Sequence, residues 1–286
     1  MSNNRDHATN SMMVDLRVST WTARKQDKRV SKEVATSHNM GAHMGSYYKS
    51  LVSSNELAEV NRLVSAARAA HYKWTLPWLD SGPRVLPAAV FFEYSQEMAE
   101  YRNAFNDAVD RFIDVYDHQK EEARKVLGTT YSPEDYPASW ELAYKFGFVT
   151  HFAPVPTGND FRCEIPQAEA DQIREQVEQT TNQAMESAVV SLYSRMADVV
   201  SAFVERLGES DKVFRDSLVE NARELVDILP RLNVTGNERI AKLSARIKDC
   251  LCKYEPSHLR ASPAVREKTY QEAVRIQDDL ADFLRG

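Results

Sequence analysis

The spacing of apolar residues predicts that most of the chain is helical. In six segments apolar side chains recur every three or four residues, which is the period of an amphipathic α-helix. These segments are 55–72, 88–127, 167–207, 211–229, 237–254 and the stretch that begins at Ser262. Gly128, Gly208 and Pro230 follow three of them, at places where a helix is expected to end. Short connections between the last four segments favour antiparallel packing, so we predict a helical bundle.

Three shorter segments alternate apolar and polar residues with the period of two that indicates a β-strand. They are 13–21, 148–152 and 160–165. The last two flank a proline-containing turn and predict a hairpin, and the first is expected to add a third strand because an isolated hairpin is only marginally stable. The predicted fold class is therefore mainly α, a long-helix bundle with a small antiparallel β-sheet of about three strands.

These patterns divide the chain into three predicted parts. Residues 1–12 are polar and without periodicity, which predicts a disordered tail. Residues 13–165 combine the strands with a long helix and form an α+β domain, and residues 166–286 form a helical bundle. A helix over 88–127 would be about 60 Å long. We expect such a helix to be kinked or to lie in an exposed coiled pairing.

The segment 74–87 interrupts the helical pattern with two tryptophans, three prolines and one glycine. Proline fixes φ and lacks an N–H, so we predict an ordered loop or a short extended piece between two helices. Asp80 and Arg84 could close this loop with a charge-assisted hydrogen bond. Trp74 and Trp78 are either core side chains or part of a binding surface.

Charge is distributed unevenly along the chain. The formal net charge is −6, but residues 1–49 contain eight Lys/Arg and four Asp/Glu and carry +4, which leaves −10 for the remainder. A basic amino-terminal end on an acidic body indicates either an anionic partner or a solvated basic surface.

Motifs with a defined catalytic mechanism are missing from the sequence. Gly41 and Gly45 are not followed by the Lys-Ser/Thr of a phosphate-binding loop, and His38 and His43 lack the further ligands of a zinc site. The missing motifs leave the question of an enzyme open and favour a non-catalytic protein that needs no cofactor and no metal ion.

The sequence also carries signals for cellular location. Its three cysteines, Cys163, Cys250 and Cys252, are expected to be reduced thiols. The amino-terminal residues do not resemble a secretory signal, and no apolar run approaches the roughly 20 residues of a membrane span. We predict a cytoplasmic protein without a membrane partner.

Basic and aromatic residues that follow Trp21 are the main candidates for binding. Cations neutralise phosphates and aromatic rings stack on bases, as non-specific binding of single-stranded DNA requires. The predicted nucleic-acid-binding residues are Arg24, Lys25, Lys28, Arg29, Lys32, Tyr48, Lys49, Lys73, Trp74 and Arg84. The alternative is that the tryptophans near them are core residues.

Several short motifs carry a resemblance to a known family. They are Thr75-Leu76-Pro77-Trp78, Pro133-Glu134-Asp135-Tyr136-Pro137, Phe146-Gly147-Phe148 and Asp160-Phe161-Arg162. Over residues 13–165 the chain resembles a family of uncharacterised proteins of tailed phages and prophages. The family has no established activity, so the resemblance implies a phage protein in the host cytoplasm and supplies no catalytic residues. Leu79 and Ser81 depart from the more polar or acidic pattern expected there.

Two functions are predicted from these observations. The first is a phage-encoded accessory protein of DNA metabolism that binds or anneals single-stranded DNA without catalysis and assembles as a homo-oligomer along the strand. The second is a structural or scaffold-type helical protein that binds other phage proteins. The acidic body and the long helices favour the second function.

Overall fold

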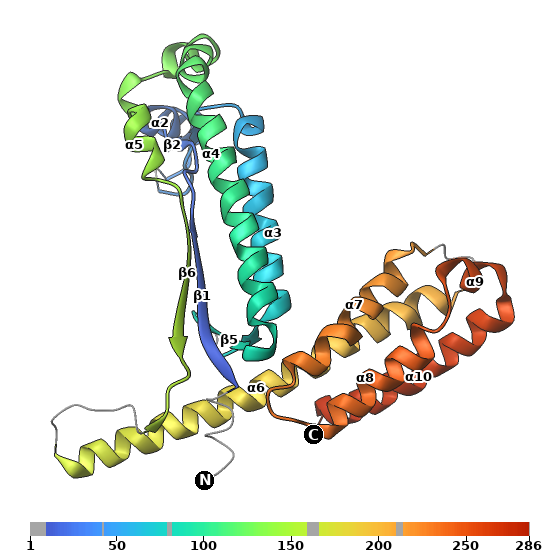
Figure 1. The fold of residues 1–286 in the computed structure, drawn as a ribbon. Helices are drawn as coiled ribbons and strands as arrows, with labels where there is room; N and C mark the ends of the chain where they lie inside the picture. The colour runs from blue at the N-terminus through green and yellow to red at the C-terminus, as the bar shows by residue number, and fades with distance from the viewer. Residues whose placement is uncertain (1–9, 42, 79–81, 159–165, 210–213, 286) are drawn as a thin grey trace. The chain divides into compact units, whose positions relative to one another are not determined.

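The structure is a computed structural model, and it describes residues 10–41, 43–78, 82–158, 166–209 and 214–285. It is mainly α-helical, with long helices and a small antiparallel sheet, which confirms the fold class predicted from the sequence (Figure 1). The described residues fall into two compact units. Unit 1 comprises Met1–Asp15, Trp74–Glu93 and Phe152–Gly286, and unit 2 comprises Leu16–Lys73 and Tyr94–His151.

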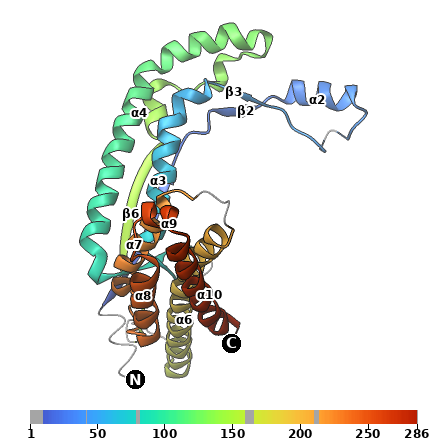
Figure 2. The ribbon, with the colours of Figure 1, turned by 90° about the vertical axis from the view of Figure 1, so that its right-hand side faces the viewer.

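Two helices form the frame of unit 2. They are α3 (Ala58–Trp74) and α4 (Phe91–Leu127), which run side by side in both views, with α4 curved along its length (Figures 1 and 2). A buried hydrogen bond of 2.9 Å joins His71 Nδ1 on α3 to the hydroxyl of Tyr94 on α4. Phe105 of α4 packs against Phe148, with ring centroids 5.8 Å apart. These contacts explain why the apolar faces predicted for both helices are buried.

The larger sheet has four described strands in the order β4-β5-β1-β6. Its strands are β1 (Ser11–Ser19), β4 (Leu76–Pro77), β5 (Arg84–Pro87) and β6 (Gly147–Pro154). β1 lies close to the predicted strand 13–21, and β6 covers the predicted strand 148–152. The segment rich in tryptophan and proline contributes β4 and β5, and β5 pairs antiparallel with β1. The predicted returning strand 160–165 and Cys163 lie outside the described residues.

Unit 1 contains the carboxyl-terminal helices as a bundle (Figure 1). Its helices are α6 (Gln167–Leu207), α7 (Ser217–Leu232), α8 (Glu238–Leu251), α9 (Pro256–Ala261) and α10 (Pro263–Arg285). Tyr193 of α6 stacks on Phe283 of α10, with ring centroids 3.7 Å apart. Asn237 caps α8 by accepting hydrogen bonds from the backbone N–H groups of the next turn. Pro230 lies inside the last turn of α7 and does not end it, in contrast to the expected stop before this residue.

Five further short elements lie between the long ones. They are η1 (Ser54–Leu57), η2 (Ala88–Val90), η3 (Gly128–Thr130), η4 (Pro133–Asp135) and α5 (Ser139–Ala143). The helices predicted over 55–72 and 88–127 thus begin with a 3₁₀ turn, η1 and η2 respectively, before α3 and α4. β1 begins at Ser11, inside the predicted amino-terminal tail, and residues 1–9 of that tail lie outside the described residues. The sequence assigns residues 74–93 to the α+β domain, whereas their contacts in the structure place them in one unit with the bundle helices. The three-part domain division stays a prediction.

Among the described helices, α6 is the one whose length and composition would allow it to cross a membrane. The expectation of a cytoplasmic protein without a membrane partner stays a prediction. Leu192, Met196 and Val200 of this helix are buried in the bundle of unit 1. Of the 18-residue apolar window in α6, 33% is buried, and the core helix of a soluble protein passes the same test of length and hydropathy.

Candidate nucleic-acid interface

Unit 2 carries a small appendage, residues 24–50, which we name the basic arm. It consists of β2 (Arg24–Gln26), α2 (Lys28–Ser37) and β3 (Tyr48–Ser50). The two strands pair antiparallel, with Lys25 opposite Lys49 and Gln26 opposite Tyr48. Figure 2 shows α2 extending away from α3 and α4. The arm contains six Lys/Arg and two Asp/Glu, so it carries a formal charge of +4.

The start of α2 is fixed to the strand pair by Asp27 and Ser31. The Asp27 carboxylate accepts hydrogen bonds from the backbone N–H groups of Arg29 and Val30, both 3.0 Å long, which makes it the N-cap of the helix. The backbone of Asp27 donates to the Tyr47 carbonyl at 2.9 Å. Ser31 Oγ donates to the Asp27 carbonyl and accepts from the Tyr47 N–H. These bonds set the direction in which α2 leaves the strands.

The end of α2 is closed by a Schellman motif. Asn39 has a φ of 50°, in the left-handed region that asparagine tolerates better than most residues. The N–H of Met40 donates to the Ala35 carbonyl at 2.9 Å, and the N–H of Asn39 donates to the Thr36 carbonyl at 3.3 Å. Both bonds are those of the motif, so α2 has a defined end at Ser37.

Lys49 anchors the arm to the turn that follows α4. Its side chain is 5% exposed, and its ammonium group lies 2.6 Å from Asp135 and 3.9 Å from Asp27. The same group donates to the carbonyl oxygen of Thr130. The guanidinium of Arg29 donates to the neighbouring Thr129 carbonyl at 3.0 Å. Lys49, one of the residues predicted to bind nucleic acid, is therefore a buried structural cation.

The base of the arm is rooted in an apolar cluster of unit 2. Its buried members are Ala23, Val52, Leu57, Phe112, Tyr116 and Leu142. Trp21 packs against this cluster, with its ring centroid 5.7 Å from that of Tyr116 in an edge-on geometry. The hydroxyl of Tyr116 donates to the Pro137 carbonyl at 3.0 Å, and burial raises the pKa of that hydroxyl. Trp21 thus supports the alternative that the tryptophans are packing residues.

Three predicted residues are not part of the arm. Trp74 is buried, as is Trp78, which agrees with a core role for both tryptophans. Arg84 of β5 donates to the Thr75 hydroxyl at 2.7 Å, and Lys73 is half-buried at the end of α3. Trp74 and Arg84 belong to unit 1, whereas the arm belongs to unit 2. Asp80 lies outside the described residues, so its predicted bond to Arg84 is not described.

Arg84 belongs to a buried polar group in unit 1. Arg195 of α6 donates to the Thr75 carbonyl, and Arg84 donates to the same oxygen at 3.3 Å. Burial, and then the charge of Arg84, lowers the pKa of Arg195 to about 10. These bonds give Arg84 a structural role at the start of β4, which its sequence context did not distinguish from phosphate binding.

The remaining predicted residues are exposed on the arm. They are Arg24, Lys25, Lys28, Arg29, Lys32 and Tyr48. Cross-strand pairs share a face of a ribbon, so Arg24, Gln26 and Tyr48 lie on one face and Lys25 on the other. Tyr47 and Met44 are also exposed and were not predicted as site residues. Tyr47 is next to Tyr48 in the sequence, and Met44 lies between Gly41 and Gly45. These positions were the signal that could have indicated the two residues.

The described part of the chain has no cluster of side chains arranged to bind a metal ion, and its two cysteines are not activated thiols. No group of three or more His, Cys, Asp or Glu residues that could hold a metal ion occurs there. Cys250 and Cys252 are free thiols, and burial raises the pKa of Cys252 to about 11. A thiol with this pKa is almost fully protonated at neutral pH and is a poor nucleophile.

No protein-family model matches the chain, and comparisons with curated proteins and with solved structures give no significant match. The function of this protein is therefore argued from the geometry of its own residues.

The Asp27 cap leads to a prediction about pH. The backbone N–H of Val30, followed by the charge of Lys49, holds the pKa of Asp27 below its usual range. A lowered native pKa stabilises the arm above the unfolded pKa of about 3.9, and this stabilisation is lost as pH falls through the native value. We expect amide exchange in α2 to accelerate strongly below about pH 4 relative to the intrinsic exchange rate.

The matched control for this pH effect is Asp27→Asn, because asparagine caps a helix but does not titrate. In this variant amide exchange of α2, corrected for the intrinsic rate, should depend much less on pH between about 5 and 3. If the variant and the parent show the same acid-induced loss of protection, Asp27 is not the titrating group.

Proposed function

We propose that this protein binds single-stranded DNA without catalysis, through the basic arm. The observation that carries the proposal is a single appendage that holds five exposed cations beside exposed Tyr47 and Tyr48. Cations along a strand supply sequence-independent affinity for phosphates, and exposed aromatic rings supply stacking on bases. The acidic remainder of the chain would leave the arm as the preferred contact for a polyanion.

The geometry of the arm suggests a division of roles among its residues. Arg24, Lys25, Lys28 and Lys32 would contact phosphates, and Tyr48, 57% exposed, would stack on a base. Arg29 has one guanidinium N–H already committed to Thr129, so its remaining donors would serve as a secondary phosphate contact. Lys49 would hold the arm in place and make no contact with DNA.

The wider proposal is that of a phage accessory protein that anneals single strands in the host cytoplasm as a homo-oligomer. Its support is the sequence resemblance described above. A defined start and end of α2 would present the cations in a constant arrangement from one copy to the next. Such repetition suits a protein that follows a strand without reading its sequence.

The test is the salt dependence of binding to a fluorescent single-stranded oligonucleotide. We expect the affinity to fall as salt rises, with a slope of about −0.7 in log K against log salt for each phosphate contacted. The variant Arg24→Ala/Lys25→Ala/Lys28→Ala/Lys32→Ala should lower the magnitude of this slope by about 2 to 3 and weaken binding at least tenfold at low salt.

Four exposed cations of unit 2 outside the arm provide the control. These are Arg62, Arg68, Arg102 and Lys125. Their replacement by alanine changes the net charge by the same amount but leaves the arm intact, so the slope should stay close to that of the parent. Equal losses in both variants would show a general charge effect, and no binding of the parent at low salt would contradict the proposal.

A second function, assembly with other protein subunits, is favoured by a separate observation. Trp140 and Tyr144, at the start and the C-cap of α5, are 69% and 84% exposed. Large exposed aromatic side chains are enriched where proteins contact other proteins.

Light scattering with and without oligonucleotide separates the two functions. Large oligomers that are indifferent to the oligonucleotide favour assembly, and a change of mass on addition favours DNA binding.

A further inference from the structure

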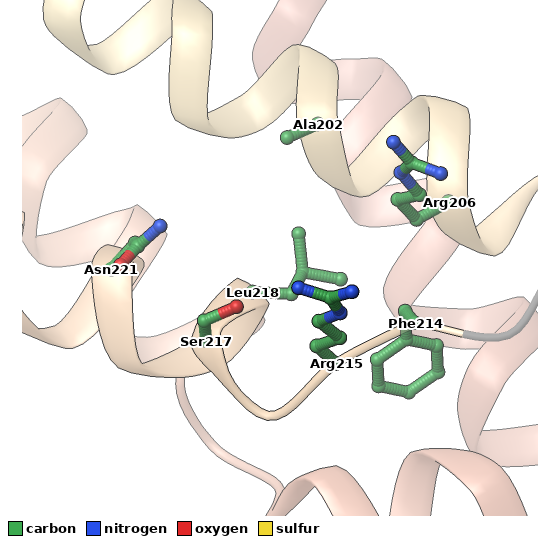
Figure 3. A pocket seen from close by; sticks show the side chains of 7 residues that line it. All are labelled: Ala202, Arg206, Phe214, Arg215, Ser217, Leu218 and Asn221. Atoms are coloured by element: carbon green, nitrogen blue, oxygen red, sulfur yellow. The ribbon is translucent and has the colours of Figure 1, made fainter. Parts of the chain in front are cut away.

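Unit 1 contains a pocket of about 500 Å³ between the end of α6 and the start of α7. Its lining residues are Ala202, Arg206, Phe214, Arg215, Ser217, Leu218 and Asn221. Figure 3 shows the two arginines on one side of the pocket, Arg206 from α6 and Arg215 from the segment before α7. Ser217 and Asn221 of α7 lie toward the other side. The pocket residues belong to unit 1, whereas the basic arm belongs to unit 2.

Phe214 is a lining residue that fixes the chain beside this pocket. Its side chain is 3% exposed, and the guanidinium groups of Arg260 and Arg266 lie 5.5 and 5.8 Å from its ring centroid. Arg260 also donates to the Phe214 carbonyl at 3.3 Å. The neighbouring Arg215 is thereby held at the rim of the pocket while its own side chain is exposed.

Two of the negative groups next to the pocket are neutralised by arginines of α9 and α10. Arg266 donates to the carbonyls of Arg206 and Leu207 at 2.9 and 3.2 Å, so it caps the negative end of the α6 dipole. Asp216, at the start of α7, pairs with Arg260 at 2.7 Å. An anion in the pocket would therefore meet little repulsion from these two groups.

The two pocket arginines retain donors for a ligand. The contact between Arg206 and Glu205 is 3.8 Å long, which is beyond hydrogen-bonding distance. The side chain of Arg215 makes no hydrogen bond or ion pair with any residue that the structure describes. Each guanidinium can offer a planar pair of N–H groups, the arrangement that matches phosphate and carboxylate oxygens.

We propose that this pocket binds the phosphate group of a small phosphorylated molecule. Two guanidinium groups, the Ser217 hydroxyl and the Asn221 amide provide more donors than the two oxygens of a carboxylate can use. A phosphomonoester has three terminal oxygens and a charge of about −1.5 to −2, which fits this set. The volume of the pocket lies within the range of about 300 to 1,000 Å³ that is typical of small-molecule sites.

Calorimetric titration tests the proposal with three probes: inorganic phosphate, adenosine 5′-monophosphate and adenosine. We expect both phosphate-bearing probes to bind saturably and adenosine not to bind. Tighter binding of the nucleotide than of inorganic phosphate would identify a phosphorylated metabolite as the ligand, and equal binding would identify free phosphate. Either result supports a phosphate site.

The decisive variant is Arg206→Gln/Arg215→Gln, which removes both charges and keeps polar side chains of moderate length. We expect it to weaken binding of the phosphate probes at least tenfold. Arg275→Gln is the control, because Arg275 is exposed on α10, pairs with Glu272 and does not line the pocket. It should bind as the parent does.

Two outcomes would overturn the proposal: no saturable binding of either phosphate probe, or binding that the double variant leaves unchanged. If the double variant does not fold, as judged by circular dichroism, Arg215→Gln alone is used. The Arg215 side chain forms no polar contact with another described residue, so its replacement is not expected to affect folding. It should weaken binding of the phosphate probes severalfold.

Discussion

Replacing Phe112 with alanine is expected to destabilise unit 2 by about 3 to 5 kcal/mol, the usual cost of removing a large buried aromatic side chain. Phe112 is 2% exposed. Its ring centroid lies about 6 Å from those of Trp21, Tyr116 and Phe146, so a truncated side chain would leave a cavity among these three rings. Chemical denaturation, followed by amide exchange of peptides from the middle of α4, measures this loss.

Phe92→Ala is the control for this prediction. The chemical change is the same and the residue lies on the same helix, but the Phe92 side chain is 81% exposed. We expect a change in the free energy of unfolding within about 0.5 kcal/mol. Similar losses for Phe92→Ala and Phe112→Ala would contradict the assignment of Phe112 to the core of unit 2.

Replacing Lys49 with alanine is expected to lower the free energy of unfolding of unit 2 by about 2 to 4 kcal/mol. The variant leaves Asp135 and the Thr130 carbonyl without their cation, and removing one partner of a buried ion pair costs more than the pair itself contributes. Asp135 keeps 16% of its side chain exposed, so water can offset part of the loss and the figure stays below that of a fully buried pair.

The arm offers a matched control for Lys49. Lys25 lies directly opposite it in the β2–β3 ladder, carries the same side chain and is exposed. Lys25→Ala should change the stability by less than about 0.5 kcal/mol and should weaken oligonucleotide binding instead. A Lys49→Met/Asp135→Leu variant should recover part of the stability, since it leaves neither charge of this pair buried alone. Equal destabilisation by Lys25→Ala and Lys49→Ala would contradict the structural role of Lys49.

This pair of lysines also shows what the sequence could and could not predict about the site. The local composition indicated a basic segment after Trp21, and most of its cations are exposed as expected. Burial of Lys49 depends on Asp135 and Thr130, more than 80 residues away in the chain. No local pattern contains that information, so structural and binding cations look alike in the sequence.

The sequence predicts the long elements of the fold better than the short ones. α6 spans Gln167–Leu207, the range predicted from its apolar period, because a helix of this length repeats the pattern many times. β4 and β5 have two and four residues, too few for alternation to show, and their proline-rich sequence indicated a loop or an extended piece. Their pairing with β1 is a long-range contact that the spacing of residues does not encode.

The pocket of unit 1 had no sequence signal of its own. Arg206 and Arg215 stand nine positions apart on the two sides of the break after α6, and they belong to no motif with a known mechanism. Both line the same pocket because Phe214 is buried and its ring lies against Arg260 of α9 and Arg266 of α10. Only the packing of the bundle brings these groups together.

The division of the chain between the two units has a consequence for the order of events on the ribosome. All residues of unit 2 precede Phe152, whereas unit 1 needs α10 to pack against α6. All of unit 2 is therefore synthesised before the bundle helices, and residues 74–93 are synthesised before their partners in unit 1. A nascent chain that has emerged as far as Phe152 already contains every residue of unit 2, including the whole basic arm.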